Sequence, residues 1–214
     1  MFGIIYENIF SATEKFMKCL IFIIPFIMVT IYYASRQNLR ISKLHILGEL
    51  IFTYLIVYIL DFTTISSLAR ILYIGIEIRP ETFNFIPFKS IKTDVFSYIT
   101  NIILFIPFGF LCSTLWKNQR SVKHVALGGF LFSLTIETSQ IFSMRVTDVD
   151  DLLMNTIGTI IGYLIFRIIQ KFSAIKNSFV LVGYSEIPFV LKHEVWFLIY
   201  IVFAFEFLIL PYLS

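Results

Sequence analysis

Carboxylate and amide side chains recur at helical spacing in the second half of an otherwise apolar chain. Glu137 and Gln140 stand at positions i and i+3, which places them on one face of a helix. Asp148, Asp151 and Asn155 stand at i, i+3 and i+7 and form a second stripe of the same kind. Neighbouring carboxylates can move protons, and carboxylates with amides can hold the cationic or amide groups of a ligand. The two stripes therefore predict either acid–base chemistry or a polar binding site.

The carboxylate of Glu137 needs polar neighbours because an apolar run surrounds it. A charge near the centre of a membrane helix is unfavourable by roughly 2.5–3.5 kcal/mol, so such a side chain normally turns into the protein. We expect its partners to be Arg145, two helical turns further on, or Asn101 and Asn155 from other helices. Of these only Arg145 can neutralise the charge. We therefore predict a functional role, rather than a purely structural one, for Glu137 and Arg145.

A segment upstream could cover this polar group. Residues 84–89 read Asn-Phe-Ile-Pro-Phe-Lys. Pro87 fixes its own backbone and pushes Ile86 toward an extended conformation, and the aromatic side chains around it suit a membrane interface. We accordingly predict a set of binding residues: Asn84, Pro87, Asn101, Gln140, Arg145, Asp150 and Asn155.

The aspartates also have simpler interpretations. Thr147 or Asp148 could cap the following helix, because a side-chain oxygen accepts hydrogen bonds from the free N–H groups of a first turn. Asp148, Asp150 and Asp151 could bind a divalent ion, but three acids in one loop without histidine are a weak metal signature. No nucleotide-binding fingerprint is present either. The sequence therefore predicts no metal site and no cofactor.

The composition shows what kind of protein positions these residues. Of 214 residues, 58% are hydrophobic and 14% are charged, whereas a soluble domain is about 25% charged. An apolar run of roughly 20 residues spans a bilayer as a helix. Six such runs predict an all-α, polytopic transmembrane bundle: 16–34, 44–60, 98–116, 125–142, 152–169 and 195–213. Residues 62–78 contain Arg70 and a Ser/Thr cluster, which favour an interfacial amphipathic helix.

The charges predict an orientation for the bundle. Lys and Arg are concentrated in the loops after the first, third and fifth predicted spans, which places those loops in the cytoplasm. The acids are concentrated in the other loops: Asp61, Glu77, Glu81, Asp94, Asp148, Asp150 and Asp151. The polar stripes then face the outside of the cell. The net charge of +3 is too small and too scattered to indicate a nucleic-acid partner.

Four residues within the predicted spans have structural interpretations. Glu49, near the inner end of the second span, could extend to the interface or pair with Lys43. Glu206 is expected to be isolated in the last span. Gly158 and Gly162 form a pair of small residues one helical turn apart, which allows two helices to approach closely.

The motifs, in their order along the chain, resemble the VanZ-like membrane proteins. They are Asn84-Phe-Ile-Pro-Phe-Lys, Asn101 with Leu104-Phe-Ile-Pro-Phe-Gly, Glu137-Thr-Ser-Gln, and Arg145-Val-Thr-Asp-Val-Asp-Asp with Asn155-Thr-Ile-Gly. Thr147 stands where a Ser is more usual. The resemblance divides the chain into a two-span region (1–80), a VanZ-like core (81–169) and a basic loop with the last span (170–214). It implies a bacterial membrane protein associated with resistance to teicoplanin-type lipoglycopeptide antibiotics in Gram-positive bacteria.

Three mechanisms are compatible with these residues, and membrane lipids are expected partners in each. In the first, the outward polar pocket engages a lipid-linked cell-wall precursor or a lipoglycopeptide and reduces antibiotic access. In the second, the protein is an enzyme that acts on such a precursor, with Glu137 or Asp151 as general base and Asp148 as its partner or as part of a Mg²⁺ site. The third is a small transporter that relays protons through Glu49 and Glu206, although no internal repeat is visible.

Overall fold

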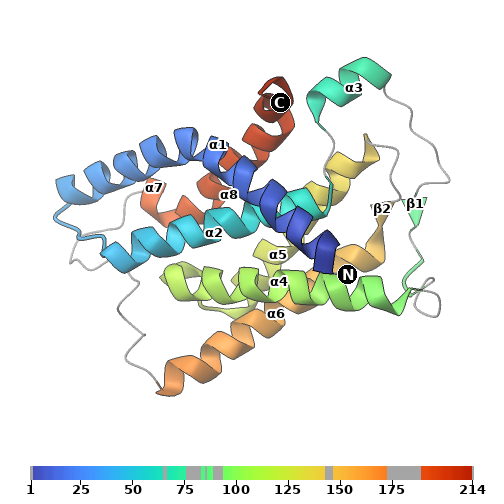
Figure 1. Ribbon diagram of the computed structural model, residues 1–214. Coiled ribbons are helices and arrows are strands. Elements are labelled where there is room, and N and C mark those ends of the chain that lie inside the picture. Colours follow the sequence, from blue (N-terminus) through green and yellow to red (C-terminus); the bar gives the residue numbers. More distant parts are fainter. Residues whose placement is uncertain are drawn as a thin grey trace.

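The computed structural model describes residues 2–64, 67–75, 83–84, 86–88, 94–142, 147–172 and 189–213. Long helices dominate it (Figure 1): α1 (Phe2–Arg36), α2 (Lys43–Phe62), α4 (Val95–Leu115), α5 (Val122–Ile141), α6 (Val149–Phe172) and α8 (Glu194–Ala204). The short elements are α3 (Leu68–Ile74), η2 (Lys117–Gln119), α7 (Phe189–Lys192), the π-helical turn η4 (Phe205–Ile209) and η5 (Leu210–Tyr212). Two described strands, β1 (Phe83–Asn84) and β2 (Thr147–Asp148), are two residues long. The predicted all-α bundle is confirmed.

Five described helical segments are long and apolar enough to cross a membrane: Tyr6–Arg36, Lys43–Phe62, Val95–Leu115, Val149–Lys171 and Glu194–Tyr212. Many of their large apolar side chains are exposed on the protein surface, as a lipid environment requires. The remaining predicted span is α5, whose 20 residues carry the buried polar side chains of Ser133, Glu137 and Gln140. A helix of this length is about 30 Å long, which still matches a bilayer core. The protein is therefore a membrane-embedded helical bundle.

Two of these helices have a polar N-cap residue immediately before the apolar run. The Oγ of Ser42 accepts a hydrogen bond from the backbone N–H of His45 at the start of α2, over 3.0 Å. The Oδ1 of Asp94 accepts one from the N–H of Ser97 at the start of α4, over 3.1 Å. Such caps satisfy N–H groups that have no partner inside the helix. Short polar loops therefore set the helix boundaries.

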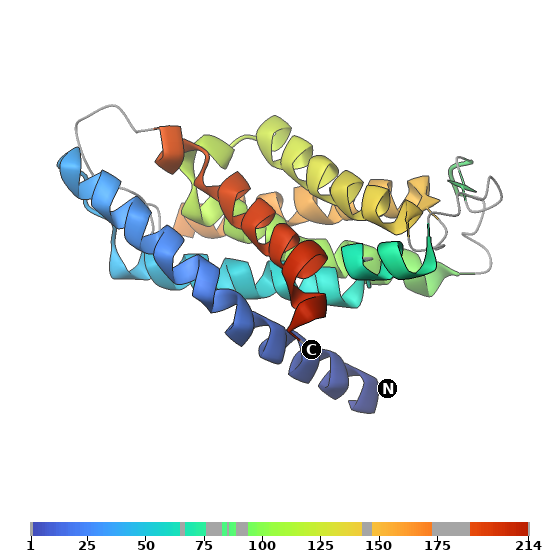
Figure 2. The same cartoon turned by 90° about the horizontal axis from the view of Figure 1, so that it is seen from above.

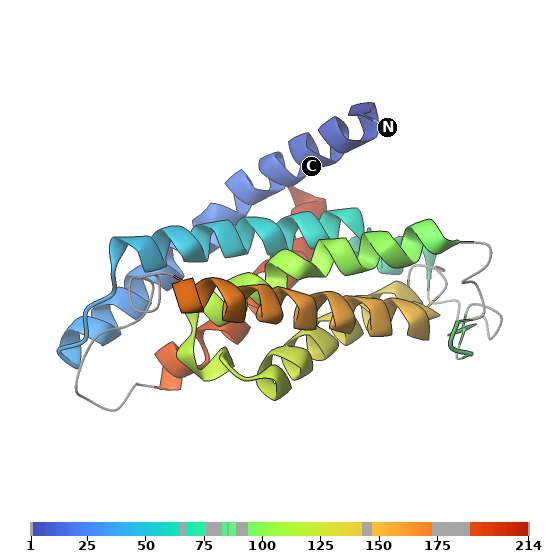
Figure 3. The same ribbon diagram turned by 90° about the horizontal axis from the view of Figure 1, so that it is seen from below.

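The bundle has two chemically different ends, which lie at opposite sides in Figures 2 and 3. We call one the acidic end, where α4 and α6 begin and α2 and α5 finish; its described acids include Asp61, Asp94, Asp148, Asp150 and Asp151. We call the other the basic end; its described cations include Arg36, Arg40, Lys43, Lys117, Arg120, Lys123, Lys171 and Lys192. This separation is the one that the loop charges predict, and the orientation in a membrane stays a prediction.

The segment after α2 forms a short helix rather than a span. α3 has seven residues, Leu68–Ile74, and is about 10 Å long, which is too short to cross a bilayer. It contacts the turns η4 and η5 at the acidic end. Leu72 is 70% exposed and Tyr73 is 91% exposed. These exposed apolar side chains support the prediction that this segment lies at the membrane surface.

α4 and α6 run in the same direction and touch backbone to backbone. A Cβ added at Gly162 would lie 2.0 Å from the carbonyl oxygen of Ile106, and one added at Gly158 would lie 2.3 Å from that of Ile102. Both distances are far below van der Waals contact, so the interface has no room for a side chain. The small-residue packing that the spacing of these glycines predicts is therefore present.

Aromatic rings fill the centre of the bundle and connect α4 to two other helices. The ring of Phe108 on α4 lies 5.6 Å from that of Phe52 on α2 and 5.2 Å from that of Phe132 on α5, measured between centroids. All three side chains are almost completely buried. Aromatic pairs at this separation add about 0.5–1.5 kcal/mol beyond the burial of their area. This core holds α4 in place between its neighbours.

We expect Gly162→Ala to destabilise the bundle, because the added methyl group must displace the backbone of α4. Overpacking of this kind lowers the free energy of unfolding by roughly 1–3 kcal/mol. Gly128→Ala is the matched control, since its Cβ would meet only the Trp196 ring, at 3.9 Å. Denaturant titration in mixed micelles measures both variants. Equal stability of the two would contradict the close contact of α4 and α6.

Candidate functional site at the acidic end

A short parallel strand pair brings the chain before α4 to the start of α6. β1 pairs with β2 so that Phe83 is opposite Thr147 and Asn84 is opposite Asp148. The side chains of the second pair also meet, because Nδ2 of Asn84 donates a hydrogen bond to Oδ2 of Asp148 over 2.9 Å. Two predicted site residues, 64 positions apart in the sequence, are thereby in direct contact.

Asp150 holds the turn that follows β1. Its carboxylate is 1% exposed and accepts the backbone N–H of Phe88, at 2.8 Å to Oδ1 and 2.9 Å to Oδ2. The hydroxyl of Tyr98 on α4 donates to Oδ2 as well. Phe88 has a φ of +62°, which is uncommon for a bulky residue, and its neighbour Pro87 is exposed in the same turn. Asp150 therefore anchors a strained turn and the start of α4.

The other carboxylates of this end are also hydrogen-bonded. Nδ2 of Asn101 donates to Oδ1 of Asp151 over 2.5 Å, which links α4 to α6. Oε2 of Glu137 accepts the backbone N–H of Asp148 over 3.2 Å, which links α5 to the start of α6. Oδ1 of Asp148 accepts the N–H of Asp150 over 2.9 Å. Asp148 thus has the helix-capping contact that the sequence allowed, in addition to its bond with β1.

Three predicted residues lie apart from this group or outside the described chain. Nε2 of Gln140 donates to the carbonyl oxygen of Thr63 over 2.8 Å and ties α5 to the end of α2. Nδ2 of Asn155 donates to Oγ of Ser133 over 2.9 Å inside the bundle, where Asn155 is 2% exposed. Arg145 lies outside the described residues. Its pairing with Glu137 stays a prediction.

Tyr98 is the contributor to this site that sequence reasoning missed. It precedes Asn101 by three positions, so both side chains lie on one face of α4. This spacing was a usable signal, because a tyrosine in line with an amide offers a second donor toward the same neighbour. Its acceptor, Asp150, stands 52 positions further along the chain, a distance that no local pattern covers.

The geometry favours a hydrogen-bonding surface over a metal cage. Each of the four carboxylates, those of Glu137, Asp148, Asp150 and Asp151, accepts at least one hydrogen bond from a different element. Within the described ranges, the one group of His, Cys, Asp and Glu side chains spaced to share a metal ion lies at the basic end. The acidic end can accordingly hold a cationic or amide group of a ligand through carboxylate oxygens.

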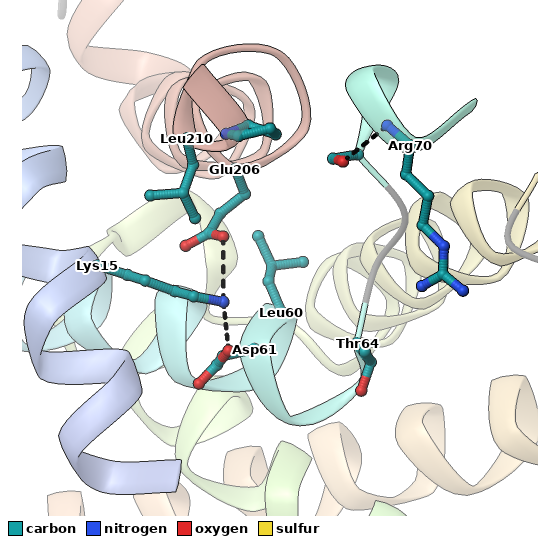
Figure 4. A pocket seen from close by; sticks show the side chains of 9 residues that line it. Lys15, Leu60, Asp61, Thr64, Arg70, Glu206 and Leu210 are labelled. Carbon is teal, nitrogen blue, oxygen red and sulfur yellow. Dashed lines mark hydrogen bonds and ion pairs between the residues drawn. The ribbon is translucent and has the colours of Figure 1, made fainter. Parts of the chain in front are cut away.

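A polar pocket of about 280 Å³ lies at the same end of the bundle, between α1, α2, α3 and the C-terminal turns. Figure 4 shows Lys15 reaching toward Asp61 and Glu206 on one side, and Arg70 on the opposite wall. Lys15 forms an ion pair with Asp61, and its Nζ lies 3.7 Å from Oε2 of Glu206. The expectation that Glu206 is isolated was therefore wrong. A charge on α1, far away in sequence, compensates it.

The pocket and the carboxylate group share the C-terminal end of α2. Thr64 lines the pocket. The backbone carbonyl oxygen of its neighbour Thr63 accepts a hydrogen bond from the side-chain amide of Gln140. Gln140 stands one helical turn from Glu137. The hydrogen bond between Gln140 and Thr63 thus connects α5, which carries Glu137, to the chain beside the pocket.

The comparison with known proteins places the chain in a family. The family model described as VanZ/LLP1 matches residues 20–170. The chain belongs to the VanZ/LLP1 family. One relative is "Protein VanZ" of Enterococcus faecium, which is 35% identical over 74 residues, or 34% of this chain and 45% of that protein. The chain therefore spans less than half the length of that relative, and no solved structure matches it.

The VanZ/LLP1 match covers the four carboxylates of the acidic end and only part of the neighbouring pocket. The match begins within α1 and includes Tyr98 and Asn101 together with the four carboxylates, those of Glu137, Asp148, Asp150 and Asp151. It therefore extends further toward the N-terminus than the motifs of 81–169. Lys15 and Glu206 of the pocket lie beyond its limits.

We expect Tyr98→Phe and Asp150→Asn to destabilise this VanZ/LLP1-family protein and to do so non-additively. Tyr98→Phe removes a buried hydrogen bond to a charged group, which contributes roughly 1.5–3 kcal/mol, and Asp150→Asn removes the charge that strengthens the same bond. Because both act on one contact, the double variant should lose less stability than the sum of the single ones. Unfolding in mixed micelles measures the four members of this cycle. Strict additivity would show that the two side chains do not interact.

Proposed function

We propose that the protein lowers susceptibility to teicoplanin-type lipoglycopeptide antibiotics by engaging a component of the cell envelope with its acidic end. The component is a molecule anchored in the membrane by a lipid, such as a lipid-linked cell-wall precursor. Membership of the VanZ/LLP1 family supports the link to resistance, because a relative carries the name VanZ. The partial coverage of that relative makes the antibiotic and the mechanism part of the proposal.

The observation that carries the proposal is the convergence of four carboxylates at one end of a membrane bundle. A membrane protein is expected to have few carboxylates with a purely structural role, because each buried carboxylate needs donors to offset its lost hydration. Here donors come from β1, the turn at 86–88, α4 and α6 itself. Such an arrangement keeps several acceptor oxygens together at a fixed place, which suits recognition of an ammonium or amide group.

The polar pocket supports a ligand with both a charged head and an apolar tail. Its volume of about 280 Å³ is close to the lower limit of small-molecule sites, so it fits a head group rather than a whole lipid. Arg70 and Lys15 on its walls offer donors to an anionic group, while Asp61 and Glu206 offer acceptors. Exposed apolar side chains on the surrounding helices offer a surface against which an acyl chain can lie in the membrane.

The distribution of charges supports an orientation in which the acidic end faces outward from the cell membrane. Loops rich in Lys and Arg remain in the cytoplasm, and those loops belong to the basic end. The acidic end then faces the compartment in which cell-wall precursors and lipoglycopeptides meet. The same orientation makes a cytoplasmic substrate an unsuitable ligand for the carboxylates.

Glu137→Gln tests the proposal with little disturbance of the fold. Gln keeps an oxygen that can accept the N–H of Asp148, removes the negative charge and replaces the second carboxylate oxygen by an NH2 group. We expect a susceptible Gram-positive host carrying this variant to have the teicoplanin susceptibility of the host without the gene. Thr138→Val is the matched control, because Thr138 is exposed on the same helix and its hydroxyl donates to the carbonyl oxygen of Leu134, one turn earlier.

The readouts are the minimal inhibitory concentration of teicoplanin and the amount of each variant in the membrane fraction. Full resistance with Glu137→Gln at normal membrane level would contradict the proposed role of the acidic end. Incubation of the purified protein with a lipid-linked precursor, with and without Mg²⁺, separates binding from catalysis. A converted product in mass spectra would show an enzyme instead of a binding protein.

A further inference from the structure

Three ionisable side chains meet at the basic end, far from the acidic group. His45 and Glu49 stand one helical turn apart on α2, and Glu194 is the first residue of α8. All three side chains are completely buried. The sequence suggested that Glu49 extends to the interface or pairs with Lys43, and this was wrong, because its carboxylate turns into the bundle toward His45. Glu194 was not noticed at all.

The donor atoms of these residues are spaced like the ligands of one ion. Nε2 of His45 lies 2.9 Å from Oε1 of Glu49 and 3.0 Å from Oε2 of Glu194. One nitrogen or oxygen atom from each residue lies within 4.8 Å of those of the other two. Ligands bound at about 2.0–2.2 Å around a tetrahedral ion are roughly 3.3 Å apart. The cluster therefore needs only small adjustments to surround a cation.

Hydrogen bonds among the described residues leave part of this cluster unsatisfied. Oε2 of Glu49 and Oε1 of Glu194 are buried and lack a hydrogen-bond partner among the described residues, and Oε1 of Glu49 has Nε2 of His45 at 2.9 Å. Nε2 of His45 carries at most one hydrogen and cannot serve two carboxylates fully. Leaving a buried carboxylate oxygen without a donor is strongly unfavourable. A cation bound between the three side chains would compensate these oxygens.

The charge balance points to the same kind of ligand. Two buried carboxylates with a neutral imidazole have a net charge of −2, and a charged imidazole still leaves −1. Among the described residues, neither carboxylate forms an ion pair with Lys or Arg. A divalent cation with a neutral imidazole would bring the cluster to zero, which suits a site without exposure to water.

We propose that His45, Glu49 and Glu194 bind a divalent first-row transition-metal ion. One imidazole nitrogen with carboxylate oxygens is a donor set suited to Zn²⁺ or Mn²⁺. Trp116, which follows α4, supports the set by donating its Nε1–H to Oε2 of Glu194 over 2.8 Å. Because the ligands come from α2 and α8, the ion joins the second and last membrane helices at the basic end. Full burial indicates a structural site rather than a catalytic one.

The test uses the full chain, purified in detergent with an affinity tag that contains no histidine. After treatment with a chelator and gel filtration, Zn²⁺ or Mn²⁺ is added back, and bound metal is measured by inductively coupled plasma mass spectrometry. We expect about one equivalent per chain and a higher melting temperature with the ion, because a ligand that binds only the folded state stabilises it. Mg²⁺, which prefers oxygen ligands and retains its waters, should be a poor substitute.

Three variants give the result its specificity. Glu194→Gln keeps an acceptor for Trp116 but removes a charged ligand, so it should abolish metal retention and the rise in melting temperature. The Trp116 ring lies 5.0 Å from that of Phe52, so Trp116→Phe leaves an aromatic ring at this contact and removes the N–H donor, and metal affinity should fall roughly 10–100-fold. His124→Gln is the matched control, because His124 is exposed at the same end of the bundle, and it should bind metal like the parent chain.

Two results would overturn the proposal. One is a parent chain that neither retains Zn²⁺ or Mn²⁺ nor gains melting temperature when either is added. The other is equal binding by the parent chain and by Glu194→Gln, which would place the metal elsewhere. If Glu194→Gln fails to fold, the comparison of Trp116→Phe with His124→Gln decides the question instead. Equal affinity of those two variants would contradict the site.

Discussion

The backbone contact between α4 and α6 is the constraint on which the acidic end depends. Gly162 leaves no side chain between the two helices, so α6 lies directly against the carbonyl groups of α4. Because the helices run in the same direction, both begin at the same end of the bundle. The first-turn acids of α6 therefore meet the polar side chains at the start of α4, as in the contacts of Asp150 with Tyr98 and of Asp151 with Asn101.

The same arrangement explains how one end of a membrane protein tolerates several carboxylates. The N-terminus of a helix has a partial positive charge, and the acids of α6 lie in its first turn. Backbone N–H groups and side-chain donors satisfy the acceptor oxygens, and Lys15 compensates the acids of the neighbouring pocket. The polar end is thus built from hydrogen bonds between elements. At the basic end, by contrast, buried carboxylate oxygens of Glu49 and Glu194 lack donors, which suits a metal ion there.

The sequence predicted what depends on local spacing and missed what depends on distant partners. Helical periodicity placed Asp151 on a polar face, and the glycine spacing of α6 indicated close packing, because both follow from the geometry of one helix. Composition also predicted the membrane bundle. The partner of Glu206 is Lys15, 191 positions earlier, and Glu194 meets residues of α2, so neither contact has a local signature. The contact between Tyr98 and Asp150 was missed for the same reason.

Orientation in the cell is the claim from which the proposed role of the acidic end follows, and thiol labelling tests it most directly. Ile86→Cys places an exposed thiol at the acidic end and Lys117→Cys places one at the basic end, while the native Cys19 and Cys112 are buried. A membrane-impermeant maleimide is applied to intact cells and then to permeabilised cells, with the parent chain as control. We expect the thiol at residue 86 to react in intact cells and the thiol at residue 117 to react only after permeabilisation. The reverse pattern would place the carboxylates in the cytoplasm and contradict the proposed function.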